Sequence, residues 1–264
     1  VGSSAFIEYP RTESEVISRR WEHKTRPQSP PGLEVLELWC PPTDYTTCVL
    51  LDDTGYIAGL QIALNVEKFT DSIYDWTAQG FTYWTTTNRD GDTENYWTIC
   101  QFFISAESLT RSPEERIAAR DSSLMLQDTS IWVSSFNGTL LEISRDVSLL
   151  DTENSDFTRQ NCIPWMGLHY YYRMTADIEC GPDTLLPWFP LVDSEQLIGI
   201  GLIMFGKHDP GSGNRNWFEE PTSSVVRLIV PRGPECLYNL ADSPGLVTLH
   251  TYYIRHPYLV TCIF

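Results

Sequence analysis

Apolar and polar residues alternate along most of the chain with the period of β-strands. Residues 33–39 nearly alternate, as a strand with one buried face does. Residues 48–51 and 56–64 flank an Asp-Asp-Thr-Gly turn and predict a hairpin. Residues 81–87 and 96–104 are rich in Thr, Tyr, Trp and Phe, and the polar segment between them has turn chemistry. The pattern predicts a mainly β chain.

One short helix is indicated, in residues 112–121. Ser112 is a typical capping residue, Pro113 suits the first helical position, and Glu115 completes a capping box. We therefore expect a sandwich- or barrel-like β fold with one short helix.

Four segments of the first half recur in the same order in the second half, which predicts an internal duplication into two related β units. Residues 40–44, 50–52, 57–62 and 98–104 match residues 180–183, 191–193, 198–203 and 248–254 by residue class. We expect a polar N-terminal arm at residues 1–32, a first β unit at residues 33–150 and a second β unit at residues 160–264.

The net charge of the chain limits its partners. Acidic residues number 35 and basic residues 18, which gives a formal net charge of −17. Nucleic acids and anionic membrane surfaces require clustered Lys and Arg, so we expect neither as a partner. The longest uninterrupted apolar stretch, residues 197–206, is about half the length of a membrane-spanning helix, so no membrane span is expected.

The seven cysteines are dispersed and form no C-x-x-C pair, so a structural zinc cluster is not expected. Dispersed cysteines favour disulfides, and the odd number leaves one cysteine that is either buried and inert, which we favour, or paired with another chain. The disulfide candidates are Cys40, Cys48, Cys100, Cys162, Cys180, Cys236 and Cys262. Disulfides form in oxidising compartments, and no apolar leader precedes Val1, as expected if a signal peptide has been removed. We expect a secreted, extracellular protein.

Asn137 begins the one N-x-S/T sequon of the chain, in an Asn-Gly-Thr sequence that is also a hairpin turn signal. Both interpretations place Asn137 at an exposed tip, and we expect a glycan there. A second turn-like segment, residues 88–94, has oxygen ligands at alternate positions, as calcium loops have. Because Gly91 is misplaced and the closing Glu is replaced by Ile99, we interpret this segment as a polar hairpin turn.

Four of the five histidines lie in the second half of the chain, and three of them suggest a site. His169 and His250 lie in aromatic strands, and His208 lies in a Gly/Pro loop. One hypothesis is that these three converge, with Asp193 or Asp209 as an orienting carboxylate, to bind a metal or to act as general acid and base. The alternative is that the histidines are separate, each with hydrogen bonds of its own. The chain has no HExxH, GxSxG, P-loop or Rossmann signature, and its sequence leaves the identity of any cofactor unknown.

Aromatic residues with polar tips are abundant, with 9 Trp and 13 Tyr. Such side chains line pockets for sugars or flat organic molecules, and they also fill ordinary β cores. The candidate ligand-binding residues are Tyr171, Trp188, Trp217 and Tyr252.

These observations leave three classes of function open. The first, which we favour, is an extracellular protein that binds a small organic molecule or glycan in an aromatic-lined pocket. The second is a secreted enzyme that uses histidines of the second half on a small aromatic or oxidisable substrate, by oxidoreductase-type or metal-assisted chemistry. The third is an extracellular structural or assembly protein, which predicts a homo-oligomer.

Overall fold

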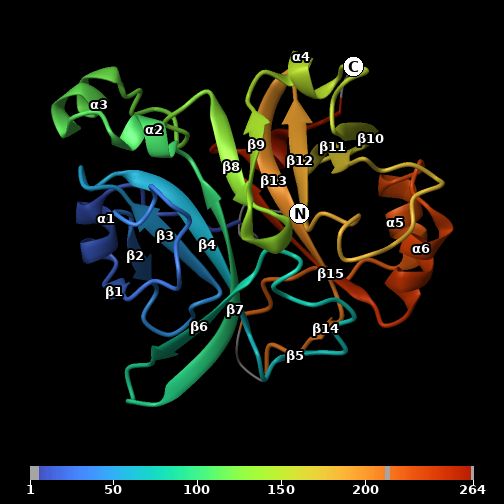
Figure 1. Ribbon diagram of the computed structural model, residues 1–264, viewed down its shortest axis with the longest axis horizontal. Coiled ribbons are helices and arrows are strands. Elements are labelled where there is room, and N and C mark those ends of the chain that lie inside the picture. Colours follow the sequence, from blue (N-terminus) through green and yellow to red (C-terminus); the bar gives the residue numbers. More distant parts are fainter. Residues whose placement is uncertain (1–5, 212–214, 263–264) are drawn as a thin grey trace. The chain divides into compact units, whose positions relative to one another are not determined.

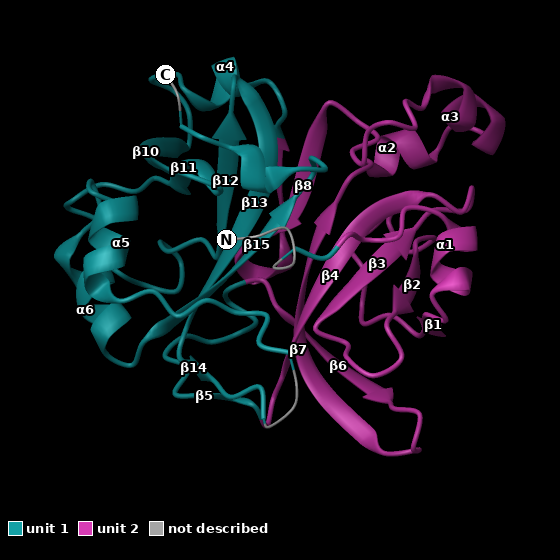
Figure 2. Cartoon of the chain, turned by 180° about the vertical axis from the view of Figure 1, so that it is seen from behind, with its two compact units in different colours: residues 1–7, 68–79, 144–264 teal, residues 8–67, 80–143 magenta. Residues whose placement is uncertain are grey.

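The computed structural model describes residues 6–211 and 215–262. It shows three antiparallel sheets with few and short helices, which confirms the expected mainly β fold. The chain divides into two compact units, drawn in different colours in Figure 2. Unit 1 comprises residues 1–7, 68–79 and 144–264, and unit 2 comprises residues 8–67 and 80–143.

Unit 2 is built on an eight-stranded sheet in the order β1-β2-β3-β4-β7-β8-β9, with β6 paired to β7 (Figure 1). Its strands are β1 (Glu22–Lys24), β2 (Glu37–Cys40), β3 (Thr47–Leu51), β4 (Ile57–Asn65), β6 (Thr82–Thr87), β7 (Thr93–Phe102), β8 (Ser130–Ser134) and β9 (Leu140–Ser144). Its helices are α1 (Glu13–Ser18), α2 (Ala106–Leu109), α3 (Pro113–Ala119) and the 3₁₀ turn η2 (Phe136–Gly138). The N-terminal arm contributes to this unit, because β1 pairs with β2.

Local sequence signals placed several of these elements correctly. The β3–β4 and β6–β7 hairpins form where they were predicted. Helix α3 has the complete capping box, with the Ser112 side chain bonded to the backbone of Glu115 and the reverse bond also present. The strand predicted from residue 33 begins instead at Glu37, because Leu33 and Leu36 lie in successive turns after Pro30 and donate their backbone N–H groups within those turns.

Unit 1 is built on a five-stranded sheet in the order β10-β11-β12-β13-β15, with a two-stranded β5–β14 ribbon. Its strands are β5 (Phe69–Thr70), β10 (Phe157–Ile163), β11 (Gly167–Tyr172), β12 (Trp188–Asp193), β13 (Gln196–Phe205), β14 (Lys207–His208) and β15 (Leu246–Tyr252). Its helices are α4 (Val147–Leu150), α5 (Ser223–Ile229), α6 (Glu235–Asp242) and the 3₁₀ turn η3 (Pro257–Leu259). The sequence indicated only one helix, α3, whereas the described residues contain six α-helices.

Helices α5 and α6 lie side by side against the five-stranded sheet (Figure 1). Their apolar side chains join the sheet in one buried core, in which Val226 of α5 and Leu237 of α6 pack with Phe189 and Leu191 of β12. Burial of this apolar surface is what holds two such short helices in place, since isolated helices of this length are unstable in water.

Three disulfides form within the chain: Cys40–Cys48, Cys162–Cys262 and Cys180–Cys236. The last of these ties α6 to the segment before β12. Cys100 is the free cysteine. Burial raises the pKa of Cys100 to about 11, although Arg26 acts in the opposite direction. The thiol is therefore protonated at neutral pH, which makes it a poor nucleophile.

The recurring sequence segments occupy comparable strands in the two sheets. Strands β3, β4 and β7 are neighbours in unit 2, as β12, β13 and β15 are in unit 1. The register of the first pair shifts between Leu50 and Leu51, and that of its counterpart between Leu191 and Val192. The duplication stays a prediction, which these shared irregularities support. Within the described part of the chain, no helix has the length and apolar character needed to cross a bilayer.

Candidate functional site

A cavity lies between the five-stranded sheet of unit 1 and helices α5 and α6. The cavity has a volume of about 50 Å³, which is room for a few water molecules or for part of one small organic molecule. The lining is mainly apolar and includes Tyr171 and Phe189 from the sheet and Val226 from α5. The titratable groups at its surface besides Tyr171 are His169, Glu219 and His250.

Strand register brings part of this lining into one row. Phe189 of β12 pairs with Gly201 of β13, which pairs with His250 of β15. A Cβ atom at position 201 would lie 1.9 Å from the ring of Phe189, so this ring occupies the space that a side chain on β13 would fill. The glycine thereby allows Phe189 to lie across β13 and approach His250, with ring centroids 5.4 Å apart.

His169 is completely buried, and its two ring nitrogens have different surroundings. Nδ1 lies 3.0 Å from the carbonyl oxygen of Gly167 and 3.3 Å from that of Asn161. Because carbonyl oxygens only accept hydrogen bonds, the proton of the neutral ring is on Nδ1. Burial, reinforced by His250, lowers the pKa of His169 to about 3. At neutral pH the Nε2 atom is therefore a hydrogen-bond acceptor, and it has no partner among the described residues.

His250 lies beside a carboxylate at the edge of the cavity. Its Nδ1 is 3.1 Å from Oε2 of Glu219, an ion-pair distance, although the two atoms are not aligned as a hydrogen bond. Burial alone would raise the pKa of Glu219, but His250 outweighs this effect and lowers the pKa. Nε2 of His250 has no partner within the described structure. The rings of His169 and His250 are nearly perpendicular, with centroids 6.1 Å apart.

The structure brings together two of the three histidines of the hypothesis. His208 lies on β14 with its ring 4.6 Å from that of Phe218, and it is not part of the described cavity lining. Asp193 ends β12 and accepts a hydrogen bond from Ser194, and Asp209 lies in the loop after β14. The carboxylate beside the histidines is Glu219 in place of either aspartate.

Of the four aromatic candidates, Tyr171 belongs to the described lining, where its ring stacks on Phe189 at 4.9 Å. Trp188 is fully buried next to Phe189, and alternation along β12 directs it to the opposite face of the sheet. Trp217 lies under Arg215. Tyr252 stacks on His250 with centroids 6.4 Å apart, behind the described lining.

Glu219 and the lining from α5 were missed by the sequence reasoning. Glu219 precedes α5 and reaches β15 through an isolated bridge to Thr248, a pairing too short to leave a periodic pattern. The signal that was available is Thr222, a residue type favoured at the N-cap of a helix.

No group of three or more His, Cys, Asp or Glu side chains in the described residues is arranged to hold a metal ion. In the turn at residues 88–92, Oδ1 of Asn88 accepts hydrogen bonds from the backbone N–H groups of Asp90 and Asp92. This oxygen is therefore used within the turn. Asn137 is exposed, in the η2 turn between β8 and β9, where a glycan would not meet the core.

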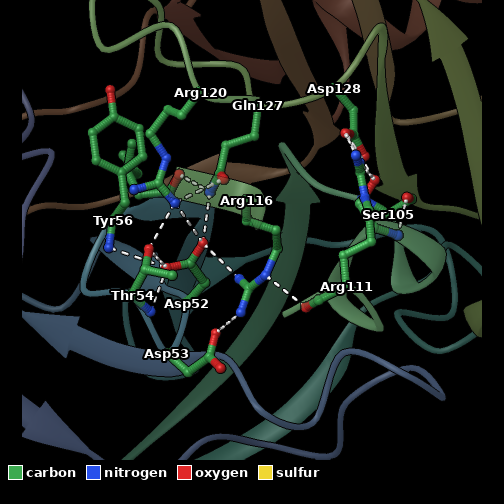
Figure 3. Close-up of polar contacts among 12 residues, drawn as sticks. Asp52, Asp53, Thr54, Tyr56, Ser105, Arg111, Arg116, Arg120, Gln127 and Asp128 are labelled. Carbon is green, nitrogen blue, oxygen red and sulfur yellow. Dashed lines mark hydrogen bonds and ion pairs between the residues drawn. The ribbon is translucent and has the colours of Figure 1, made fainter. Parts of the chain in front are cut away.

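A second cluster of buried polar side chains lies in unit 2, around Asp52 (Figure 3). Oδ2 of Asp52 accepts from Arg116 at 3.1 Å, Arg120 at 3.2 Å and Gln127 at 3.1 Å. Oδ1 accepts from the backbone N–H and the hydroxyl of Thr54 and from the backbone N–H of Tyr56. Protein donors occupy both carboxylate oxygens, so this cluster fastens α3 to the β3–β4 turn and leaves no acceptor for a ligand.

Fold and site together define a disulfide-bonded, mainly β protein of two units with a small, mostly apolar cavity in one of them. No family model, no curated protein and no solved structure matches the chain.

Proposed function

We propose that the protein binds a small, mostly apolar organic molecule in the cavity of unit 1. The observation that carries this proposal is the pair of imidazole Nε2 atoms, of His169 and His250, that have no protein partner beside the cavity. Buried polar atoms almost always have a hydrogen-bond partner, because leaving one unsatisfied costs about 1–3 kcal/mol. A ligand with a polar end would supply that partner.

The remaining lining supports an apolar body for this ligand. Tyr171 and Phe189 present aromatic rings, and Val226 and Leu237 close the other side. Cavities of this composition bind organic molecules through apolar contact and obtain specificity from a few polar groups. A glycan, which has many hydroxyl groups, would leave most of them unpaired here.

Native mass spectrometry of the protein from its natural source tests the proposal. We expect a mass excess over the denatured chain of the size of one small organic molecule. The variant Val226→Phe, which extends a side chain into the cavity, should lose this excess. The control Leu228→Phe, on the exposed side of α5, should retain it. A native mass equal to that of the chain plus its covalent glycan, together with no saturable binding in a screen of small aromatic compounds, would contradict the proposal.

The pairing of His250 with Glu219 favours a second candidate, general-base catalysis on a molecule held in the same cavity. A carboxylate beside one imidazole nitrogen orients the ring and stabilises its protonated form, while the other nitrogen can take a proton from a substrate. Mass spectrometry of the released ligand after prolonged incubation tests this candidate. A chemically altered ligand with the wild-type protein and an unaltered one with His250→Asn would support it.

We propose further that the protein is secreted. Three disulfides support this location, because such bonds persist in oxidising compartments. If it is correct, the natural protein carries a glycan on Asn137, and treatment with an N-glycosidase lowers its mass. An unmodified Asn137 in natural protein from a eukaryote would count against this location.

A further inference from the structure

We propose that the ligand of this cavity is an uncharged alcohol or phenol, with an apolar body and a hydroxyl group that donates its hydrogen to Nε2 of His169. This proposal rests on the proposed binding function and specifies its ligand class. Three observations support it: the ring proton of His169 is on Nδ1, the carboxylate of Glu219 lies beside His250, and the rest of the cavity lining is mostly apolar.

His169 determines that the ligand has a hydrogen-bond donor. Nδ1 of His169 faces two carbonyl oxygens, those of Gly167 and Asn161, and therefore carries the ring proton. Nε2 then offers a lone pair and no hydrogen. Hydrocarbons, ethers and ketones have no O–H or N–H to give it, and a ligand of these classes would leave the buried nitrogen as unsatisfied as it is without a ligand.

The surroundings of the cavity disfavour a charged ligand of either sign. An anionic ligand would meet the lone pair of His169 and the carboxylate of Glu219. A protonated amine would lose its hydration in a mostly apolar lining, which is costly unless a buried carboxylate compensates. The carboxylate available is Glu219, which is half-exposed, at 55%, and already lies beside His250. An uncharged hydroxyl gives the same hydrogen bond with a much smaller cost of dehydration.

A hydroxyl group also matches the second nitrogen. Its oxygen has lone pairs that can accept a hydrogen bond from Nε2 of His250 when that nitrogen carries a hydrogen. One hydroxyl between the two rings would thus use both of the unpartnered nitrogens. The rings of Tyr171 and Phe189, stacked 16° from parallel, favour a flat apolar body beside them.

Four molecules of nearly equal size separate these possibilities: benzyl alcohol, toluene, benzylamine and benzoate. Their dissociation constants for the full chain at pH 7.5 can be measured by ligand-detected NMR. We expect benzyl alcohol to bind about ten-fold more tightly than each of the other three, which is the typical effect of one hydrogen bond to a buried group. The same measurement on Val226→Phe locates the binding, since this variant should no longer bind benzyl alcohol if the alcohol occupies the cavity.

The variant His169→Asn sharpens the measurement. Its side-chain amide can keep the hydrogen bond to the carbonyl oxygens that Nδ1 makes, and it lacks the acceptor that Nε2 provides. We expect benzyl alcohol to bind about ten-fold more weakly to this variant, with the affinity for toluene unchanged. The matched control is His256→Asn, at an exposed histidine bonded to Tyr258 outside the cavity, which should change neither affinity.

The outcomes distinguish this inference from the binding function itself. Equal affinity for toluene, or tighter binding of benzylamine or benzoate, would overturn the alcohol or phenol inference and leave a binding cavity. Saturable binding of none of the four would overturn both proposals. If His169→Asn fails to fold, the affinity order of the four molecules on the wild-type protein decides the question alone.

Discussion

Each unit buries a cluster of polar side chains. The two clusters differ in whether the protein itself supplies all of their hydrogen-bond partners. Asp52 in unit 2 accepts six hydrogen bonds from the protein itself. His169 and His250 in unit 1 each leave one ring nitrogen without a protein partner. The requirement that buried polar groups be bonded is the same in both places. In unit 2 the chain meets this requirement itself and forms a structural clamp, and in unit 1 the proposed ligand would meet it.

The largest effect is expected from breaking the satisfied cluster. Asp52→Ala removes the carboxylate that compensates Arg116, whose side chain is only 3% exposed, and leaves a buried charge without its main partner. We expect the free energy of unfolding to fall by about 3–5 kcal/mol, measured by urea unfolding. The control is Asp53→Ala, which removes the other carboxylate on Arg116, exposed to 42%, and should cost less than about 1 kcal/mol. Similar losses for both variants would contradict the role given to Asp52.

A smaller effect is expected from adding a side chain at Gly201, which lies between Phe189 and His250 in the sheet of unit 1. Gly201→Ala places a methyl group where the Phe189 ring lies, so the ring must move toward the cavity or the strand must shift. We expect a loss of about 1–3 kcal/mol in thermal unfolding together with loss of ligand binding. Adding Phe189→Leu to this variant shortens the obstructing side chain and should restore part of the stability. A stability of Gly201→Ala equal to that of the wild type would show that Phe189 does not depend on this glycine.

The last effect, the smallest of the three when taken per pH unit, is a dependence of stability on pH that His169 creates. Its pKa is about 3 in the folded protein and about 6.5 when it is exposed. Between these values the unfolded chain binds a proton that the folded protein does not, so stability is complete above pH 6.5 and falls as the pH decreases toward 3. We expect a slope of about 1 kcal/mol per pH unit from this group in urea unfolding at pH 7.5, 6.5, 5.5 and 4.5.

Carboxylates titrate in the lower part of the same range, so the wild type has to be compared with His169→Asn. The difference between the two curves isolates the histidine. If both lose stability equally from pH 6.5 to 5.5, His169 is not held neutral by burial.

Sequence signals predicted the elements that hold the Asp52 cluster better than they predicted the elements around the cavity. The β3–β4 hairpin and the cap of α3 follow from turn and capping residues within a few positions of each other. Helix α5 has the sequence SSVVRLI, whose β-branched residues favour a strand, and it is a helix because its apolar face packs on the sheet. Such tertiary control cannot be seen in a local window.

The contact between His169 and His250 is a second example of a tertiary arrangement that a local sequence window does not show. The two residues lie on β11 and β15, separated in the sheet by β12 and β13. Their proximity depends on strand order, on the size of Gly201 and on the ring of Phe189 that crosses β13. The sequence supplied the candidate residue types, and the sheet order decided which of them share a cavity.

The pairing of β5 with β14 has a consequence for how the chain matures during synthesis. Segment 68–79 leaves the ribosome in the middle of unit 2, yet it belongs to unit 1, and its strand pairs with Lys207 and His208. The sheet of unit 2 can form soon after residue 143 has been synthesised. Strand β5 can pair only later, after β14 has been translated. A chain that ended before β14 would therefore contain β5 without its partner. Because unit 1 is made of three separate segments, it cannot be obtained by one cut in the chain.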